Sequence, residues 1–165
     1  MKKIEIMLLA ELLKNSKKSD RELAKVLGVS QPTVSRTRAK LAREKVIQEY
    51  SILPDLAKLG FELMAFTTAS FTVQRTEKFK ERAVAWMKKH PSILLASRAQ
   101  GMGKDSIMIS LHKDFTDYEN FMVTLKSDWT DSVKDIESIL VSIRGFNAKP
   151  FSFKYLSEML NPSKH

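Results

Sequence analysis

The segment spanning residues 31–43, QPTVSRTRAKLAR, carries residue types that suit contact with a nucleic acid. At about 100° per residue along a helix, Val34 and Leu41 point to one side, and small, hydroxyl-bearing and cationic residues lie opposite. A helix that enters the major groove of a duplex needs small residues for close approach, amides or guanidinium groups for base edges, and cations for phosphates. The pattern favours such a helix over its alternative, an ordinary solvated helix face.

The order of residues in this segment suggests which contact each would make. The N-terminal residues of a groove-entering helix usually touch the bases, so Gln31, Thr33 and Ser35 are expected at base edges or nearby phosphates. Arg36 is expected to contact a guanine, and the two later cations are expected to contact the backbone. The predicted residues for contact with double-stranded DNA are Gln31, Pro32, Thr33, Ser35, Arg36, Lys40 and Arg43.

Two further predicted helices hold this segment in place. Ser19 and Glu22 have the spacing of a capping box, in which a hydroxyl and a carboxylate satisfy free backbone amides at a helix start. Gly28 stands where a left-handed residue would end that helix, and Ser30 would cap the next one. Two helices joined by a short turn that contains Gly form a helix-turn-helix. An earlier helix has its apolar stripe at Ile4, Met7, Leu8 and Leu12.

The amino-acid composition limits the classes of protein to which this chain can belong. It has 165 residues, of which 43% are hydrophobic and 28% charged, and it contains no Cys. The absence of Cys excludes disulfides, cysteine metal sites and thiol catalysis. No apolar run is long enough to cross a bilayer, so we expect a cytoplasmic protein with no membrane partner. The net charge is +9, and residues 1–50 hold 12 basic against 6 acidic residues, a bias that favours a polyanionic partner.

The hydrophobic period changes after residue 53. A short wing strand is predicted over residues 48–53, followed by a linker that contains Pro54 and Gly60. The remaining chain alternates between the periods of strands and helices in the order β-α-β-β-α-β, which is the ferredoxin-like arrangement. Its second helix is expected to begin with Thr116 as the cap. The predicted fold is α+β, with a winged helix-turn-helix domain over 1–53, a linker over 54–60 and a ferredoxin-like domain over 61–165.

Alternation along the strands suggests which side chains face the two helices of this second domain. The predicted helix-facing residues are Phe61, Leu63, Ala65, Ile107, Ile109, Leu111, Ile139, Val141 and Ile143. The predicted opposite face holds Met64, Phe66, Leu94, Ala96, Met108 and Leu140, together with Thr68, Ser70, Arg98, Ser110 and His112. That face carries more apolar surface than a monomer usually exposes. We predict that two copies pack sheet to sheet; the alternative is an amphipathic sheet that faces solvent.

Four stretches of the chain resemble the Lrp/AsnC family of transcription regulators. They are residues 21–24 (RELA), 28–36 (GVSQPTVSR), 46–47 (VI) and 59–61 (LGF). The resemblance covers nearly the whole chain, with a specific helix-turn-helix and a looser match in the following domain. It implies a homodimer that binds DNA, is often assembled into tetramers or octamers, and can sense an amino acid or similar metabolite through its C-terminal domain. It implies neither an enzyme nor a cofactor.

Two positions depart from the pattern of that family. Its members usually read Gly-x-x-Asp at the turn between the second and third strands of the C-terminal domain, whereas here Gly101 and Gly103 precede Asp105. These three residues are the predicted effector-binding set, and an ordinary turn-forming Asp is the alternative. Arg38 stands where the family usually has an apolar residue, so it is expected either to extend from the core edge to a phosphate or to change how the helix docks.

Other apparent motifs do not support chemistry. His90, His112 and His165 are widely separated, so no metal site is predicted. Gly103-Lys104 lacks the other residues of a phosphate-binding loop, and no catalytic set is evident.

Two alternative functions remain. One is a chromatin-like DNA binder with little sequence preference. The other follows from a likeness to siroheme decarboxylase subunits, since Arg98, His112 and Arg144 could lie on one sheet face and bind tetrapyrrole carboxylates.

Overall fold

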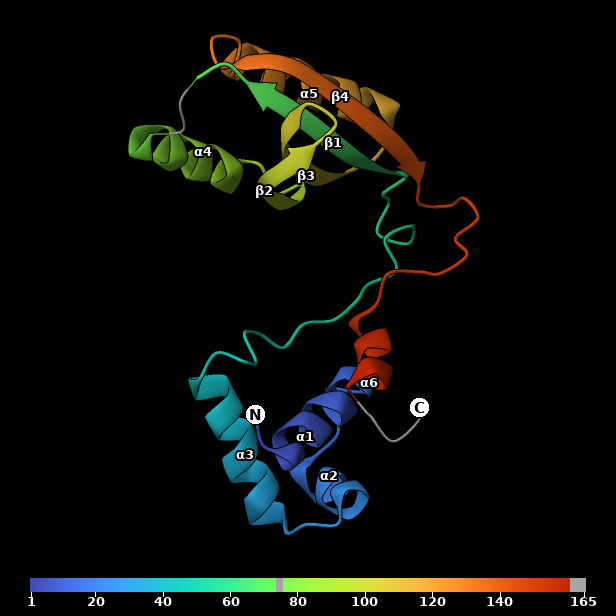
Figure 1. The fold of residues 1–165 in the computed structure, drawn as a ribbon. Coiled ribbons are helices and arrows are strands. Elements are labelled where there is room, and N and C mark those ends of the chain that lie inside the picture. The colour runs from blue at the N-terminus through green and yellow to red at the C-terminus, as the bar shows by residue number, and fades with distance from the viewer. Residues whose placement is uncertain (74–75, 161–165) are drawn as a thin grey trace. The chain divides into compact units, whose positions relative to one another are not determined.

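The computed structural model describes residues 1–73 and 76–160, so His165 lies outside the described residues. The chain divides into two compact units (Figure 1). Unit 1 consists of Met1–Leu53 with the described residues from Ala148 on, and unit 2 consists of Pro54–Asn147.

Unit 1 is built on the three predicted helices, α1 (Lys3–Lys14), α2 (Asp20–Leu27) and α3 (Gln31–Arg43). The capping box forms as expected, because the Ser19 side chain accepts a hydrogen bond from the Glu22 amide and the Glu22 carboxylate accepts one from the Ser19 amide. Gly28 ends α2 in the left-handed conformation, with φ of 67°. The core contains Leu8, Leu12, Leu23, Ala24, Val34 and Leu41.

The extended piece predicted over residues 48–53 does not form a strand. A strand needs a neighbour for its backbone amides and carbonyls, and the described part of unit 1 has no strand beside this segment. Tyr50, Ile52 and Leu53 are exposed. Turn and coil therefore lead from α3 toward unit 2.

The C-terminal segment also differs from the prediction, which placed it in the second domain. A short 3-10 helix, η1 (Phe153–Tyr155), and α6 (Leu156–Met159) pack against α1 and group with unit 1. Ala10 on α1 and Ser157 on α6 are both buried. The strand and helix periods used to divide the chain do not reveal which domain a short terminal helix joins.

Unit 2 has the predicted order β-α-β-β-α-β. Its elements are β1 (Leu63–Phe71), α4 (Glu77–Lys89), β2 (Ile93–Gly101), β3 (Lys104–His112), α5 (Phe115–Asp128) and β4 (Val133–Ser142). The strands form one antiparallel sheet in the order β2-β3-β1-β4 (Figure 1). α5 begins one residue before the predicted cap Thr116, because the Asp114 carboxylate accepts the hydrogen bond of the Asp117 amide and serves as the N-cap.

The predicted face assignment is right for β1 and wrong for β2, β3 and β4. On β2, Ala96 and Arg98 pair with Met108 and Ser106, so they lie toward the helices and not on the opposite face. Residues paired directly across antiparallel strands share a face, and Ala65 pairs with Ser110 and Leu140 rather than with Ile109 and Ile139. A one-residue difference in register moves every side chain of a strand to the other face. Ser110, His112 and Met108 therefore lie toward the helices, where Met108 joins a core with Trp86, Phe121, Met122, Leu125 and Trp129.

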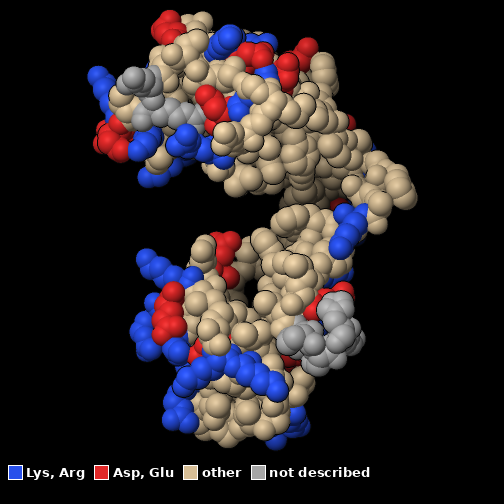
Figure 2. Space-filling model, viewed as in Figure 1, with Lys and Arg blue, Asp and Glu red and all other residues tan. Residues whose placement is uncertain are grey.

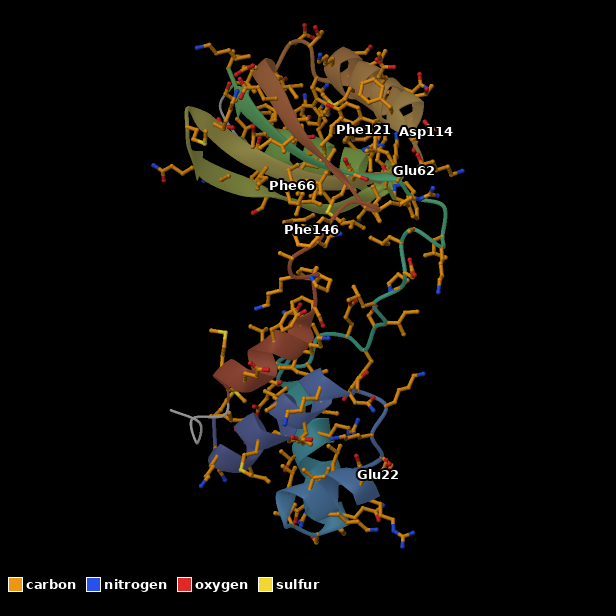
Figure 3. All side chains as sticks on the ribbon, turned by 90° about the vertical axis from the view of Figure 1, so that its right-hand side faces the viewer. Glu22, Glu62, Phe66, Asp114, Phe121 and Phe146 are labelled. Carbon is orange, nitrogen blue, oxygen red and sulfur yellow. The ribbon has the colours of Figure 1, made fainter. Side chains whose placement is uncertain are left out.

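The open face of the sheet, defined as the face away from α4 and α5, is consequently more apolar than predicted. Leu95, Ile109, Phe66 and Ile139 form a row across all four strands. Leu111, Met64 and Val141 form a second row beside it. Ile139 is 71% exposed. Figure 3 shows Phe66 on this face and Phe121 on the α5 side of the sheet.

Candidate nucleic-acid interface

α3 presents one continuous face to solvent. The Ser30 side chain accepts a hydrogen bond from the Thr33 amide, and Pro32 occupies the first turn, where its missing N–H has no intrahelical acceptor to lose. Val34 and Leu41 are fully buried on the inner side, as the spacing predicts. The exposed residues of the helix, here called the outer face of α3, are Gln31, Pro32, Ser35, Arg36, Ala39, Ala42 and Arg43.

Two arginines supply the positive charge of the outer face. The Arg36 Nε donates a hydrogen bond to the Pro32 carbonyl oxygen at 3.3 Å, which holds this side chain along the helix near its N-terminal turn. Arg43 lies two turns further on, and among the described residues no hydrogen bond or ion pair engages its guanidinium group. Lys and Arg side chains gather over this part of unit 1 (Figure 2). The spacing suits one guanidinium at base edges and one at the flanking backbone.

Lys40 does not belong to the outer face. Its Nζ lies 2.6 Å from the Glu5 carboxylate on α1 and 3.8 Å from Glu44. Glu5 is buried and also accepts a hydrogen bond from the Lys2 amide at 2.7 Å. The Lys40 ammonium, followed by the Lys2 amide, lowers the pKa of Glu5, and the Glu5 carboxylate raises the pKa of Lys40. This cation therefore joins α3 to α1, which the sequence prediction missed.

Arg38 also points inward. Its Nη2 donates a hydrogen bond to the Lys18 carbonyl oxygen at 3.1 Å and lies 2.8 Å from the Asp20 carboxylate. Both partners stand at the start of α2, so the guanidinium group joins α3 to the preceding helix. Neither predicted role, reaching a phosphate or changing the docking of the helix, is needed to explain this arginine.

Thr33 lies at the edge of the outer face and is half-buried. Its hydroxyl lies 2.8 Å from the Ser30 hydroxyl, and its carbonyl oxygen accepts a hydrogen bond from the Thr37 hydroxyl at 2.7 Å. Of the seven residues predicted to contact DNA, five are therefore exposed together, Thr33 borders them, and Lys40 is turned away. Glu5 is an acidic residue beside the apolar stripe of α1. Its position in the sequence could have indicated that a cation, here Lys40, pairs with it.

The predicted effector residues lie at the tight turn between β2 and β3. Met102 and Gly103 both have positive φ, of 52° and 71°, as the central residues of a type I′ hairpin turn require. The Met102 side chain is 99% exposed at the tip. The Asp105 carboxylate accepts a hydrogen bond from the Phe71 amide at 3.3 Å, which fixes the hairpin to the end of β1. Asp105 thus has a structural contact of its own.

Comparison with known proteins shows which proteins this chain is similar to. Residues 1–48 match a family described as winged helix-turn-helix DNA-binding. An HTH-type transcriptional regulator of Pyrococcus furiosus is 30% identical over 108 residues, which are 66% of this chain and 69% of that protein. A solved AsnC family transcriptional regulator from Agrobacterium tumefaciens has the same fold, with a TM-score of 0.77 and 18% identity over 94% of this chain and 99% of that one. The chain belongs to the HTH-type transcriptional regulators, and its fold is that of the AsnC family regulator.

The Lrp/AsnC fold extends over both units. A transcriptional regulator of Neisseria meningitidis, solved as a complex with L-Met, has a TM-score of 0.79 and 21% identity, covering 92% of this chain and 94% of that one. The helix-turn-helix followed by a four-stranded antiparallel sheet with its helices is thus common to this chain and to both solved structures.

The residues proposed for the tetrapyrrole alternative do not converge. His112 is fully buried beneath α5, its Nε2 lies 2.8 Å from the Ser110 hydroxyl, and burial lowers its pKa. Arg144 follows β4 and pairs with Glu62 at 3.4 Å, whereas Arg98 is exposed on the edge strand β2. Among residues 1–73 and 76–160, no cluster of His, Asp and Glu could hold a metal ion, and no helix could span a membrane.

Proposed function

We propose that this Lrp/AsnC regulator binds double-stranded DNA through the outer face of α3, with the helix in the major groove. The proposal rests on one observation: two of the four cations on α3 form ion pairs with neighbouring helices, and the other two are exposed. Arg38 and Lys40 are engaged by Asp20 and Glu5, whereas Arg36 and Arg43 remain exposed on one side with small residues between them. Ala39 leaves room for the groove walls between the two guanidinium groups.

Each exposed residue has a distinct proposed part. Gln31 and Ser35, near the N-terminus of α3, meet base edges or nearby phosphates, and the Arg36 guanidinium binds a guanine. Arg43 binds the phosphate backbone, which contributes affinity without reading sequence. The positive ion-pair partners Arg38 and Lys40 keep α3 at a fixed position on α1 and α2. The helix is therefore presented as a rigid surface.

We further propose that two copies associate through the open face of the sheet. The row Leu95, Ile109, Phe66 and Ile139 is apolar, and an exposed apolar surface of this kind usually marks an interface. For such a dimer we propose that the two α3 helices enter successive major grooves, about 34–36 Å apart, on a pseudo-palindromic operator. Tetramers or octamers would need additional contacts between such dimers.

Gel-shift titration over a series of salt concentrations tests the DNA-binding face. Arg36→Ala is expected to weaken operator binding by about tenfold to a hundredfold, since a bidentate guanine contact contributes about 1–3 kcal/mol. Lys126→Ala, which removes an exposed cation from α5, is the control and is expected to bind like the parent. Equal binding by Arg36→Ala and the parent would contradict the proposed face.

Competition with bulk DNA separates this function from low-specificity, chromatin-like binding. Specific binders usually prefer their site by at least about a thousandfold. A regulator should retain its operator in the presence of excess bulk DNA, whereas a chromatin-like protein should lose it in proportion to the competitor.

An amino acid bound at the hairpin from Gly101 to Asp105 is the proposed modulator. Support comes from the L-Met complex of the Neisseria meningitidis regulator, which shares the fold, and from the exposed hairpin tip. Calorimetric titration with a panel of amino acids tests this proposal. Saturable binding of one of them that Asp105→Asn abolishes would support it, and no binding by any would contradict it.

A further inference from the structure

Unit 2 contains a groove between α4 and the edge strand β2, with a volume of about 850 Å³. This volume is within the usual range of small-molecule sites. Phe79, Ala83 and Met87 line it from α4, and Ala96 and Met108 line it from β2 and β3. Trp129 closes the end beside α5. The groove is therefore apolar and aromatic along its length.

The packing of α4 explains why the groove is open. The Trp86 ring stacks on His90 at 3.8 Å between centroids and lies within 6.2 Å of both Phe121 and Trp129. Its Nε1 donates a hydrogen bond to the Asp128 carboxylate at 2.7 Å. These contacts hold α4 toward α5. On the β2 side, small residues such as Ala83 and Ala96 leave the space between helix and strand unfilled.

The charged side chains along the groove all have one sign. Lys80 and Lys88 on α4 and Arg98 on β2 line it, and none of the described lining residues is acidic. Lys80 forms an ion pair with Glu77. Among the described residues, no hydrogen bond or ion pair engages Lys88 or Arg98. An apolar groove bordered by unpaired cations is complementary to an anion with an apolar body.

We propose that this groove binds an amphipathic organic acid, with its apolar part along Phe79, Ala96 and Trp129 and its carboxylate at Arg98. The planar guanidinium group can donate two parallel hydrogen bonds to a carboxylate, whereas Lys88 adds a second positive charge near the mouth. The site shares no residue with the outer face of α3 or with the hairpin from Gly101 to Asp105. It would give the regulator a second input, chemically different from an amino acid.

Tryptophan fluorescence of the full chain gives a direct test, because Trp129 lines the groove. The probes are decanoate below its micelle concentration, neutral decanamide, and propionate, which has the carboxylate without the long apolar chain. Saturable quenching or a spectral shift by decanoate, at one molecule per chain, is expected. Decanamide should bind at least about fivefold more weakly, and propionate should produce no saturable change.

Two variants distinguish the groove from other surfaces. Arg98→Gln removes the carboxylate partner from an exposed strand position and should weaken decanoate binding by about tenfold. Ala96→Leu fills the groove and should abolish binding. Lys126→Gln makes the same change of charge on α5, outside the groove, and should bind like the parent.

Other results would overturn the proposal. They are the absence of saturable decanoate binding, equal binding of decanoate and decanamide, or unchanged binding by Arg98→Gln and Ala96→Leu. Circular dichroism of each variant must match that of the parent. Since none of these measurements contains DNA, their failure leaves the proposed DNA-binding function intact, and a failure of DNA binding leaves the groove intact.

Discussion

The outer face of α3 and the open face of the sheet are proposed to meet DNA and a second copy of the chain, and neither surface follows from residue type alone. Four cations lie between residues 36 and 43, yet Arg38 and Lys40 turn inward to carboxylates. In the sheet, the covered side contains Ser110 and His112, whereas large apolar side chains remain on the open side. In both places the neighbouring element determines the outcome. A carboxylate on an adjacent helix draws each of these cations inward, and strand register directs apolar residues outward.

The largest expected effect concerns the open face of the sheet. Phe66→Asp places a charge in the middle of the apolar row and should raise the dimer dissociation constant by about a thousandfold or more, because a buried unpaired charge is strongly unfavourable. Analytical ultracentrifugation measures this change. The control is Val123→Asp on α5, an exposed apolar residue outside the open face, which should leave association unchanged. A Phe66→Asp protein that associates like the parent would remove the open face from consideration as the interface.

The helix-turn-helix was predictable because its signals are local. Ser19, Glu22, Gly28 and Ser30 act within a few residues along the chain, so their spacing alone specifies where the helices begin and end. The partners of Arg38 and Lys40 lie 18 and 35 residues away, and no periodicity records such a pairing. The order of strands and helices along the chain was predictable for the same local reason, whereas the register of the sheet depends on pairing between distant strands. The contact between α6 and α1 is likewise long-range.

The second prediction tests whether Arg38 stabilises the packing of α3 against α2. Arg38→Met should lower the free energy of unfolding of unit 1 by about 1–2 kcal/mol, because it removes a charge-assisted hydrogen bond and an ion pair that solvent partly screens. Asp20 would lose its partner as well. Denaturant unfolding followed by circular dichroism measures the change. Stability equal to that of the parent, combined with a loss of DNA affinity, would instead assign this arginine to the DNA surface.

A smaller effect separates the outward cations from the inward ones. Arg43→Ala should weaken binding to all DNA sequences by about threefold to tenfold, and should reduce the slope of log affinity against log salt by about 1, because one phosphate contact is lost. Lys40→Met should leave that slope unchanged. If Lys40→Met reduced the slope and Arg43→Ala did not, the assignment of these two residues would have to be exchanged.

The smallest effect is on the pH dependence of stability. The Lys40 ammonium and the Lys2 amide lower the pKa of Glu5 in the folded chain, and Lys14 and Lys18 lower that of Glu11. A carboxyl group with a lowered folded pKa stabilises the fold above its unfolded pKa, which is about 4.3, and this contribution disappears as pH falls through the lower folded value. Glu5→Gln should therefore make the acid limb of the stability curve shallower. A limb as steep as that of the parent would mean that the pair with Lys40 does not contribute to acid unfolding.

Selection of bound sites from random DNA, performed in parallel with the parent and with Arg36→Ala, tests the central claim most directly. The parent should yield a pseudo-palindrome with half-sites about one helical turn apart, and the variant should lose its preference at one position in each half-site. Identical motifs from both proteins would show that the outer face of α3 does not read the bases.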